Sequence, residues 1–275
     1  MPPNFTWFIH TIMPKNLLTR IGGFVANIKI SFIKNSIIWL FIRYYKVAMQ
    51  EAVEEDFRQY HCFNDFFIRL LKPSLRPLAT ASFVSPVDGV VSAKSSIAEG
   101  QLIQAKGHSY TVNALLGDDA FSSYFKSGAF ATFYLSPKDY HRVHMPVSGE
   151  LVKMLYIPGK LFSVGPKTTE VIPNLFARNE RIVAFFKTEY GLMAMILVGA
   201  TIVGSIGTVW EGSIPRSTTV FTKEYNNIML NKGDEMGYFK LGSTVILLLE
   251  GTANIKCFTS ISTGCDIRVK QALCD

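Results

Sequence analysis

The chain has 275 residues, 48% of them hydrophobic, and a formal net charge of +7. That length can bury a full core, as one large domain or as one domain with an appendage. The longest aliphatic or aromatic run near the N-terminus covers residues 37–42, which excludes a bilayer span there because a span needs roughly 20 residues.

The charge is concentrated at the start of the chain. Six lysines and arginines and no acid precede Glu51, among many aliphatic and aromatic residues. Basic and aromatic residues together also describe nucleic-acid grooves, but the basic residues here are sparse among aliphatics. We therefore expect an anionic membrane surface, and no nucleic acid, as the partner of this segment.

The N-terminal part of the chain reads as helical. Apolar residues recur at helical spacing over 5–13, and Pro14 ends that pattern. Residues 24–48 predict a helix by length, with apolar side chains around most of its circumference, so it is either buried or in lipid. Residues 51–71 predict a further helical region. We expect residues 1–75 to form a membrane-associating region; helices that cover the core with a solvated basic face are the alternative.

The rest of the chain, residues 76–275, has a β-rich pattern. Short runs of β-forming residues are separated by Gly and Pro, which predicts a mixed, mostly antiparallel β core and an α+β fold for the whole chain. The uncharged stretch 191–210 contains four glycines among β-branched residues, so we predict two buried strands there and no transmembrane helix. The clearest strand candidates are residues 89–92, 130–135, 181–186 and 244–249.

Cysteine usage and the N-terminus bear on the compartment. The four cysteines show neither CxxC spacing nor a disulfide framework, which favours a reducing compartment. The N-terminus lacks the charged, apolar and small-residue pattern of a secretory signal, so we expect no secretion. The resulting prediction is a peripheral protein on the cytoplasmic face of the cell membrane.

Three segments place reactive groups in apolar surroundings. Asp88 opens a strand at a tight turn, and His141 and His144 lie three residues apart. Near the C-terminus Ser243 follows Gly242, whose carbonyl has no side chain to shield it from a neighbouring hydroxyl. An acid, an imidazole and a hydroxyl together predict nucleophilic chemistry.

One reaction that these residues allow is an attack of the Ser243 hydroxyl on the Gly242 carbonyl, and three other functions also fit them. The first is a serine hydrolase that uses Ser243, His144 and Asp88 on an external lipid or peptide. The second is a non-catalytic membrane-binding module with a basic arm. The third is a metal-dependent enzyme that uses the histidine pair as ligands.

Longer motifs surround these residues. They are Tyr-Tyr-Lys-Val at 44–47, Phe-Asn-Asp-Phe-Phe at 63–67, Gln-Ala-Lys-Gly-His at 104–108, Tyr-His-Arg-Val-His at 140–144, Val-Ile-Pro-Asn-Leu-Phe-Ala-Arg-Asn-Glu at 171–180 and Leu-Gly-Ser-Thr at 241–244. Together they resemble the phosphatidylserine decarboxylases of the bacterial type, and the likeness runs over nearly the whole chain.

The resemblance implies a proenzyme that processes itself. Ser243 would attack the Gly242 carbonyl and replace the peptide bond by an ester. β-Elimination would then free residues 1–242, and the dehydroalanine left at position 243 would take up water and lose ammonia to become a pyruvoyl group. The implied processing triad is Asp88, His144 and Ser243. The chains 1–242 and 243–275 would remain together as a heterodimer, within a homo-oligomer.

The resemblance also implies the reaction of the mature protein. It would be a lyase of phospholipid biosynthesis with no metal, whose cofactor is the pyruvoyl group derived from Ser243. The amine of phosphatidylserine would form a Schiff base with the pyruvoyl ketone, which accepts the electrons released as CO2 leaves. His141 is the implied donor of the proton that returns to the α-carbon, and the product is phosphatidylethanolamine.

Overall fold

A computed structural model describes residues 15–105, 108–200, 205–240, 243–251 and 256–274, with side chains from residue 21 onward. The helix expected over 5–13 lies outside these residues, and so does Gly242.

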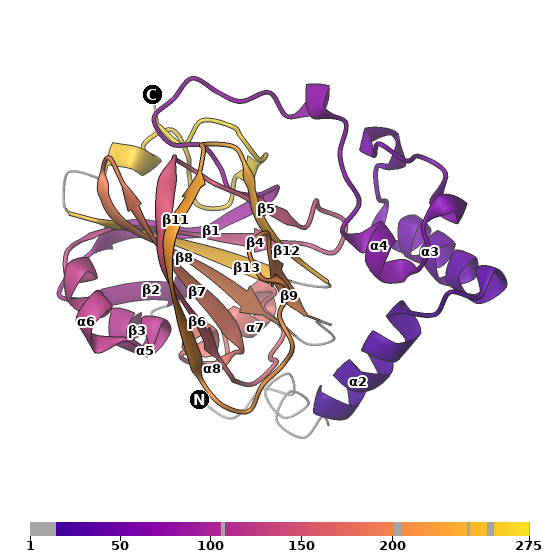
Figure 1. Ribbon diagram of the computed structural model, residues 1–275, viewed down its shortest axis with the longest axis horizontal. Coiled ribbons are helices and arrows are strands. Elements are labelled where there is room, and N and C mark those ends of the chain that lie inside the picture. Colours follow the sequence, from indigo (N-terminus) through magenta and orange to yellow (C-terminus); the bar gives the residue numbers. More distant parts are fainter. Residues whose placement is uncertain (1–14, 106–107, 201–204, 241–242, 252–255, 275) are drawn as a thin grey trace.

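Helices and strands follow the α+β order expected from the sequence (Figure 1). The helices are α2 (Lys15–Ala26), α3 (Ser31–Tyr45), α4 (Phe63–Phe67), α5 (Val112–Leu116), α6 (Asp119–Ser122), α7 (Pro166–Thr169) and α8 (Leu175–Arg178). The strands are β1 (Gly89–Ile97), β2 (Gln101–Ala105), β3 (His108–Thr111), β4 (Gly128–Leu135), β5 (Arg142–His144), β6 (Gly149–Ile157), β7 (Arg181–Thr188), β8 (Gly191–Gly199), β9 (Ile206–Thr208), β10 (Gly212–Ser213), β11 (Phe221–Leu230), β12 (Glu235–Phe239), β13 (Ser243–Glu250) and β14 (Asp266–Ile267).

The β core confirms the predicted fold class. An eight-stranded sheet has the order β11-β6-β7-β8-β13-β4-β1-β14, and its neighbouring strands pair antiparallel. A four-stranded antiparallel sheet has the order β10-β9-β12-β5, and β2 pairs with β3. The four strand candidates at 89–92, 130–135, 181–186 and 244–249 became parts of β1, β4, β7 and β13.

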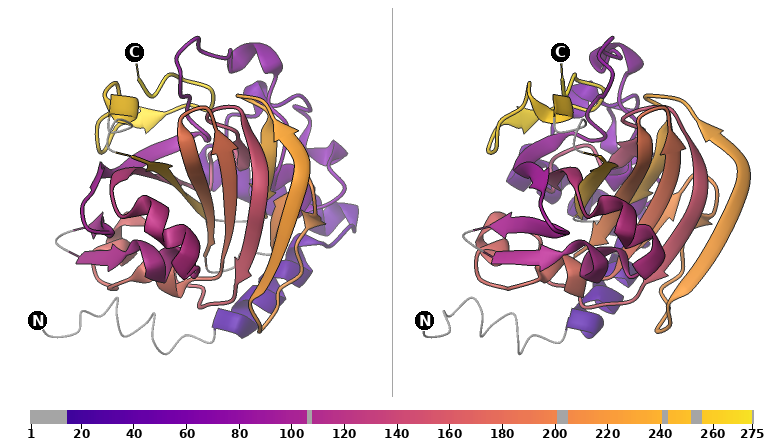
Figure 2. Two further views of the ribbon diagram at one scale, coloured as in Figure 1. Left: turned by 60° about the vertical axis from the view of Figure 1, so that its left-hand side comes forward. Right: turned by 90° about the vertical axis from the view of Figure 1, so that its left-hand side faces the viewer.

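The central strand β13 is buried on both faces. Val245, Leu247 and Leu249 pack into a cluster with side chains of the four-stranded sheet and the C-terminal segment. Ile246 and Leu248 pack into a second cluster with side chains of α5, α8 and the β2–β3 pair. Figure 2 shows these short helices against one face of the large sheet. Burial on both faces explains why this strand reads as a continuous apolar run.

The uncharged stretch 191–210 forms the buried strands β8 and β9, which confirms that prediction. Within the residues that the structure describes, no helix combines the length and the apolarity needed to span a membrane.

The single helix predicted over 24–48 is wrong, because residues 27–30 separate α2 from α3. The side-chain amide of Asn27 donates to the carbonyl of Gly23 at 2.7 Å, a local bond that competes with helix continuation. Its side-chain oxygen accepts from the amide of Asn64 at 3.0 Å, which ties the break to α4. The chain thereby folds back, and one side of α3 packs on the aromatic residues of α4.

The helical region predicted over 51–71 is mostly wrong, since the segment forms only α4 and short 3₁₀ turns. The backbone N–H of Val53 donates to the carbonyl of Leu70, and that of Lys72 donates to the carbonyl of Glu51, both at 2.9 Å. The two ends of the segment therefore bond to each other, and the backbone between them cannot be one continuous helix.

Candidate active site

Two connections between the large and the small sheet bring the candidate residues together. Ser243 opens β13 opposite Leu135, the last residue of β4. The chain leaves β4 through residues 136–141 into β5, where the backbone N–H of Phe239 donates to the carbonyl of His141 at 3.0 Å. Ser243 follows Phe239 by four residues, and four residues of extended chain span at most about 14 Å.

Ser243 has an unusual environment for a hydroxyl. Its side chain is fully buried, and its Oγ has no hydrogen-bond partner among the described residues. Its strand neighbours are Leu135 on one side and Gly199 on the other. A buried hydroxyl without a partner costs about 1–3 kcal/mol, and such a cost in a native protein is typical of a functional group.

The ring of His144 is held in one tautomer. Its Nδ1 lies 2.9 Å from the carbonyl oxygen of Gly233, and its Nε2 lies 3.3 Å from the hydroxyl oxygen of Tyr140. A carbonyl can only accept, so Nδ1 carries the proton and the lone pair of Nε2 accepts the Tyr140 hydroxyl. Burial lowers the pKa of His144 to about 4. At neutral pH the imidazole is therefore neutral and can act as a base through Nε2.

His141 is held in the same tautomer but has a different neighbour. Its Nδ1 lies 2.9 Å from the carbonyl oxygen of Asp139, and its ring centroid lies 4.1 Å from that of Phe67. Its Nε2 is buried and has no hydrogen-bond partner among the described residues. Burial, together with the charge of Arg69, lowers the pKa of His141 to about 3. The free nitrogen of this ring is therefore an unsatisfied acceptor.

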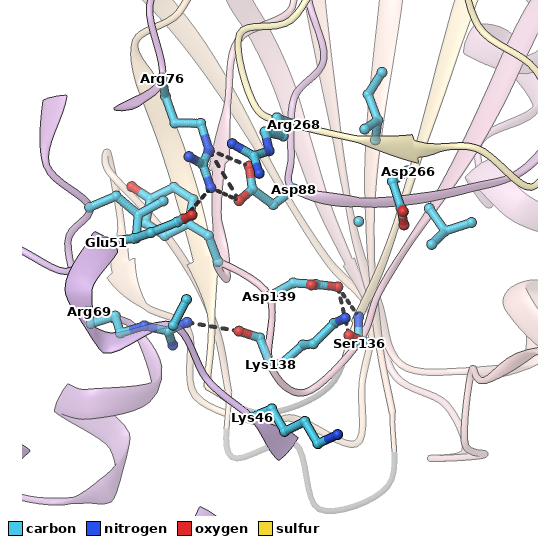
Figure 3. Close-up of a pocket in the computed structure, with 16 residues that line it drawn as sticks. Lys46, Glu51, Arg69, Arg76, Asp88, Ser136, Lys138, Asp139, Asp266 and Arg268 are labelled. Atoms are coloured by element: carbon cyan, nitrogen blue, oxygen red, sulfur yellow. Dashed lines mark hydrogen bonds and ion pairs between the residues drawn. The ribbon is translucent and has the colours of Figure 1, made fainter. Parts of the chain in front are cut away.

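Asp88 is engaged by an arginine that the sequence analysis did not single out (Figure 3). Arg76 donates to both carboxylate oxygens of Asp88, with Nη2 2.6 Å from Oδ2, and the backbone N–H of Val269 donates to Oδ1 at 2.7 Å. Nη2 of Arg76 also donates to Glu51 at 2.7 Å. These bonds outweigh desolvation and raise the pKa of Arg76. Asp88 is thus a fixed carboxylate at the junction with the N-terminal region.

The three groups of the expected triad are not joined by hydrogen bonds within the described residues. Among the described residues, no hydrogen bond links Asp88 to His144 or His144 to Ser243, and the carbonyl of Gly233 fixes the His144 tautomer. The described part of the chain also holds no group of three or more His, Cys, Asp or Glu side chains arranged to bind a metal ion.

Arg76→Met is expected to lower the free energy of unfolding by about 3–5 kcal/mol, because it leaves two carboxylates at a buried site without their cation. Urea unfolding of the variant and the parent measures this loss. Arg58→Met is the matched control, since Arg58 pairs with Asp56 and its side chain is 67% exposed against 8% for Arg76. Equal midpoints for Arg76→Met and the parent would contradict a stabilising role of the Arg76 cluster.

Three residues that contact the candidate residues were not singled out from the sequence, namely Tyr140, Arg76 and Gly233. Tyr140 stands next to His141 inside a motif already identified, so its place in the motif was a usable signal. Arg76 precedes Asp88 by twelve residues, and Gly233 follows His144 by 89. No spacing rule connects residues so far apart, so only the fold reveals these contacts.

Comparisons with known proteins bear on the family of this chain. A family model described as phosphatidylserine decarboxylase matches residues 63–274, and one described as PSD matches residues 5–46. A phosphatidylserine decarboxylase proenzyme of Legionella pneumophila (strain Lens) is 50% identical over 267 residues, which cover 95% of this chain and 94% of that protein. The proenzyme of Shewanella halifaxensis is 54% identical over 247 residues, which cover 86% of each chain. The proenzyme of Pseudoalteromonas translucida is 53% identical over 247 residues, which cover 86% of this chain and 85% of that protein. This chain belongs to the phosphatidylserine decarboxylase family.

Proposed function

We propose that this chain is a self-processing lyase that converts phosphatidylserine to phosphatidylethanolamine and CO2. The observation that carries the proposal is the fully buried Oγ of Ser243, which has no hydrogen-bond partner among the described residues. Burial also keeps the imidazoles of His141 and His144 neutral at neutral pH. Family membership supplies the substrate class, since the similar proteins are named phosphatidylserine decarboxylase proenzymes.

Self-cleavage begins with a proton transfer from Oγ of Ser243 to Nε2 of His144. The carbonyl of Gly233 already holds that imidazole with its lone pair on Nε2, and the Tyr140 hydroxyl must release it first. Asp88 acts through its charge, which raises the pKa of His144 and so favours the imidazolium that forms. Asp88, His144 and Ser243 are in this sense the processing triad.

Cleavage between Gly242 and Ser243 leaves chains 1–242 and 243–275 associated. The shorter chain contributes β13, which pairs along its length with β4 on one side and β8 on the other. A central strand with partners on both edges and burial on both faces does not leave its sheet when one peptide bond is cut. The product is therefore a heterodimer of the two chains.

The fully buried position of Ser243 fits a pyruvoyl group, because it keeps a reactive ketone away from bulk water. When present, that group supplies an electrophilic ketone that binds the substrate amine and takes up the electron pair released with CO2. His141 then delivers a proton from Nε2 to the α-carbon. An anionic substrate beside His141 raises the pKa of its imidazole, which favours the protonated form that the donor role needs.

The reaction is tested with phosphatidylserine labelled at the serine carboxylate. The purified protein is expected to release labelled CO2 and form phosphatidylethanolamine, and Ser243→Ala is expected to do neither. A serine hydrolase using Ser243, His144 and Asp88 would instead release serine, fatty acid or another hydrolysis product while the label stays in solution. That outcome would overturn the proposed reaction.

We propose that residues 1–75 attach the protein peripherally to an anionic membrane, on the cytoplasmic face of the cell membrane. One side of α3 packs on the aromatic residues of α4, while its other side, together with α2, exposes large apolar side chains. An exposed apolar surface next to basic residues suits the interface of an anionic bilayer. The exposed side chains include Phe24, Phe32, Trp39, Leu40 and Tyr44.

Phe32→Glu is expected to weaken binding to vesicles that contain phosphatidylglycerol by about tenfold or more, because Phe32 is 82% exposed and would bury its ring in lipid. Vesicle sedimentation measures the partition. Tyr124→Glu, which changes an exposed aromatic residue of the catalytic part, is the matched control and is expected to bind like the parent. Equal loss in both variants would contradict a specific role of α3.

A further inference from the structure

A cavity of about 510 Å³ lies between the N-terminal region and the edge of the large sheet. Asp88 and Tyr140 of the proposed processing step form part of its wall, and its other side chains have no role in the steps described above. Its walls come from the helical region, from the connection 136–140 and from residues 266–268. Figure 3 shows Arg69 reaching from the helical region toward Lys138 in this cavity, with Lys46 below. The cavity therefore joins the proposed membrane-associating region to the connection that carries His141.

Arg69 is a buried cation in the wall of this cavity. Its side chain is buried, with 4% of the residue exposed, and its Nη2 donates to the carbonyl of Lys138 at 2.8 Å. Its Nε and Nη1 have no hydrogen-bond partner among the described residues. Burial lowers the pKa of Arg69 even though Tyr60, Asp139, Asp88 and Glu51 lie near enough to raise it. A buried guanidinium with free N–H groups can bind an anion.

Among the described residues, none of the four carboxylates that line the cavity, those of Glu51, Asp88, Asp139 and Asp266, forms a hydrogen bond or ion pair with Arg69. Asp88 and Glu51 accept hydrogen bonds from Arg76, and Asp139 accepts from the N–H and hydroxyl of Ser136. The exposed ammonium groups of Lys46 and Lys138 also form no ion pair within the described residues, and they add positive charge to the lining.

Arg69 is adjacent to the proposed reaction centre. It donates to the carbonyl of Lys138, while His141 is bonded to the carbonyl of Asp139, the next residue. The charge of Arg69 lowers the pKa of His141, which requires the two side chains to be close. Ser136, in the cavity wall, directly follows the strand partner of Ser243.

We propose that Arg69 binds the phosphodiester of the phospholipid substrate in this cavity. The inference rests on the proposed function and names the group that recognises the headgroup. Four single bonds of about 1.5 Å separate the amine from the phosphorus of phosphatidylserine, so the phosphorus lies no more than about 6 Å from the amine nitrogen that reacts with position 243. A planar guanidinium with free N–H groups suits phosphate oxygens.

The substrate carboxylate is the poorer ligand for Arg69. A cation on that carboxylate would stabilise the ground state and oppose the loss of CO2, whereas a cation on the phosphate leaves the reacting bonds free. Neutralising Arg69 with phosphate would also remove the charge that lowers the pKa of His141. Headgroup binding would thereby prepare the proposed proton donor.

Arg69→Gln is the direct test, assayed with phosphatidylserine in mixed micelles. The KM is expected to rise about tenfold or more, because a charge-assisted contact to the phosphate is lost. Self-cleavage, read by intact mass, is expected to be complete, since processing precedes substrate binding. Arg58→Gln removes the same charge from an exposed position of the same region and is expected to keep the KM within about twofold. A KM for Arg69→Gln equal to that of Arg58→Gln would overturn the inference.

Inhibition by inorganic phosphate gives a second measurement, and on the parent protein it does not depend on how a variant folds. In the parent, phosphate is expected to inhibit competitively with phosphatidylserine. The Arg69→Lys variant is expected to be inhibited more weakly. Non-competitive inhibition would place the anion in a separate site and overturn the inference. If the parent releases no CO2, the proposed function itself fails. If the parent is active and only the Arg69 results are negative, the headgroup assignment alone fails.

Discussion

His144→Ala is expected to accumulate the uncut 275-residue chain and to release no measurable CO2. The variant lacks the neutral imidazole whose Nε2 takes the proton of Ser243, a contribution of typically about 10²–10⁴-fold in general base catalysis. Without cleavage no pyruvoyl group forms, so the loss of CO2 release is larger than that factor. A time course of intact mass after purification measures the cleavage.

Tyr140→Phe is the matched control for His144→Ala. It keeps the ring beside His144 but removes the hydroxyl that lies 3.3 Å from Nε2, so cleavage is expected to be as fast as in the parent or faster. Normal cleavage in His144→Ala would remove His144 from the processing triad.

The pH dependence of cleavage follows from the same histidine. A base acts in its unprotonated form, and burial lowers the pKa of His144 to about 4, so the active form predominates above that value. The cleavage rate is therefore expected to be flat between about pH 6 and 8 and to fall as the pH approaches the pKa. A rate that still rises through pH 6.5, the ordinary histidine pKa, would contradict this environment for the base.

His141→Ala is expected to separate processing from decarboxylation. The chain should cleave, at least in part, because His144 and Ser243 are intact. CO2 release should fall by about 10²–10⁴-fold, because the variant lacks the proton donor. Intact mass reports the cleaved fraction, and the rate is normalised to it. His61→Ala is the control, since His61 is exposed in the N-terminal region and should leave both measurements unchanged. Full activity of cleaved His141→Ala would exclude the donor role.

The strand candidates at 89–92, 130–135, 181–186 and 244–249 could be predicted because the burial of each strand is visible in a few consecutive residues. The run 244–249 is apolar throughout since β13 is central and covered on both faces, and the sequence shows that directly. The helices of the N-terminal region depend on contacts that lie far apart in the chain. Neither the bond between Asn27 and Asn64 nor the pairing of Val53 with Leu70 leaves a local pattern.

In the candidate site, too, some features could be predicted from the sequence and others could not. Asp88, His144 and Ser243 could be singled out because reactive side chains in apolar segments are visible in the sequence. Their hydrogen bonds could not, since the acceptor on Nδ1 of His144 is the carbonyl of Gly233, and a backbone carbonyl carries no residue signature. The ion pair of Asp88 with Arg76 likewise depends on how the N-terminal region meets the sheet.

Intact mass spectrometry under denaturing, reducing conditions shows whether Ser243 becomes the pyruvoyl group of the mature protein. We expect two chains, residues 1–242 and 243–275, the shorter with a pyruvoyl group in place of a free N-terminal amine. A single 275-residue chain in a preparation that releases CO2 from phosphatidylserine would exclude the pyruvoyl mechanism.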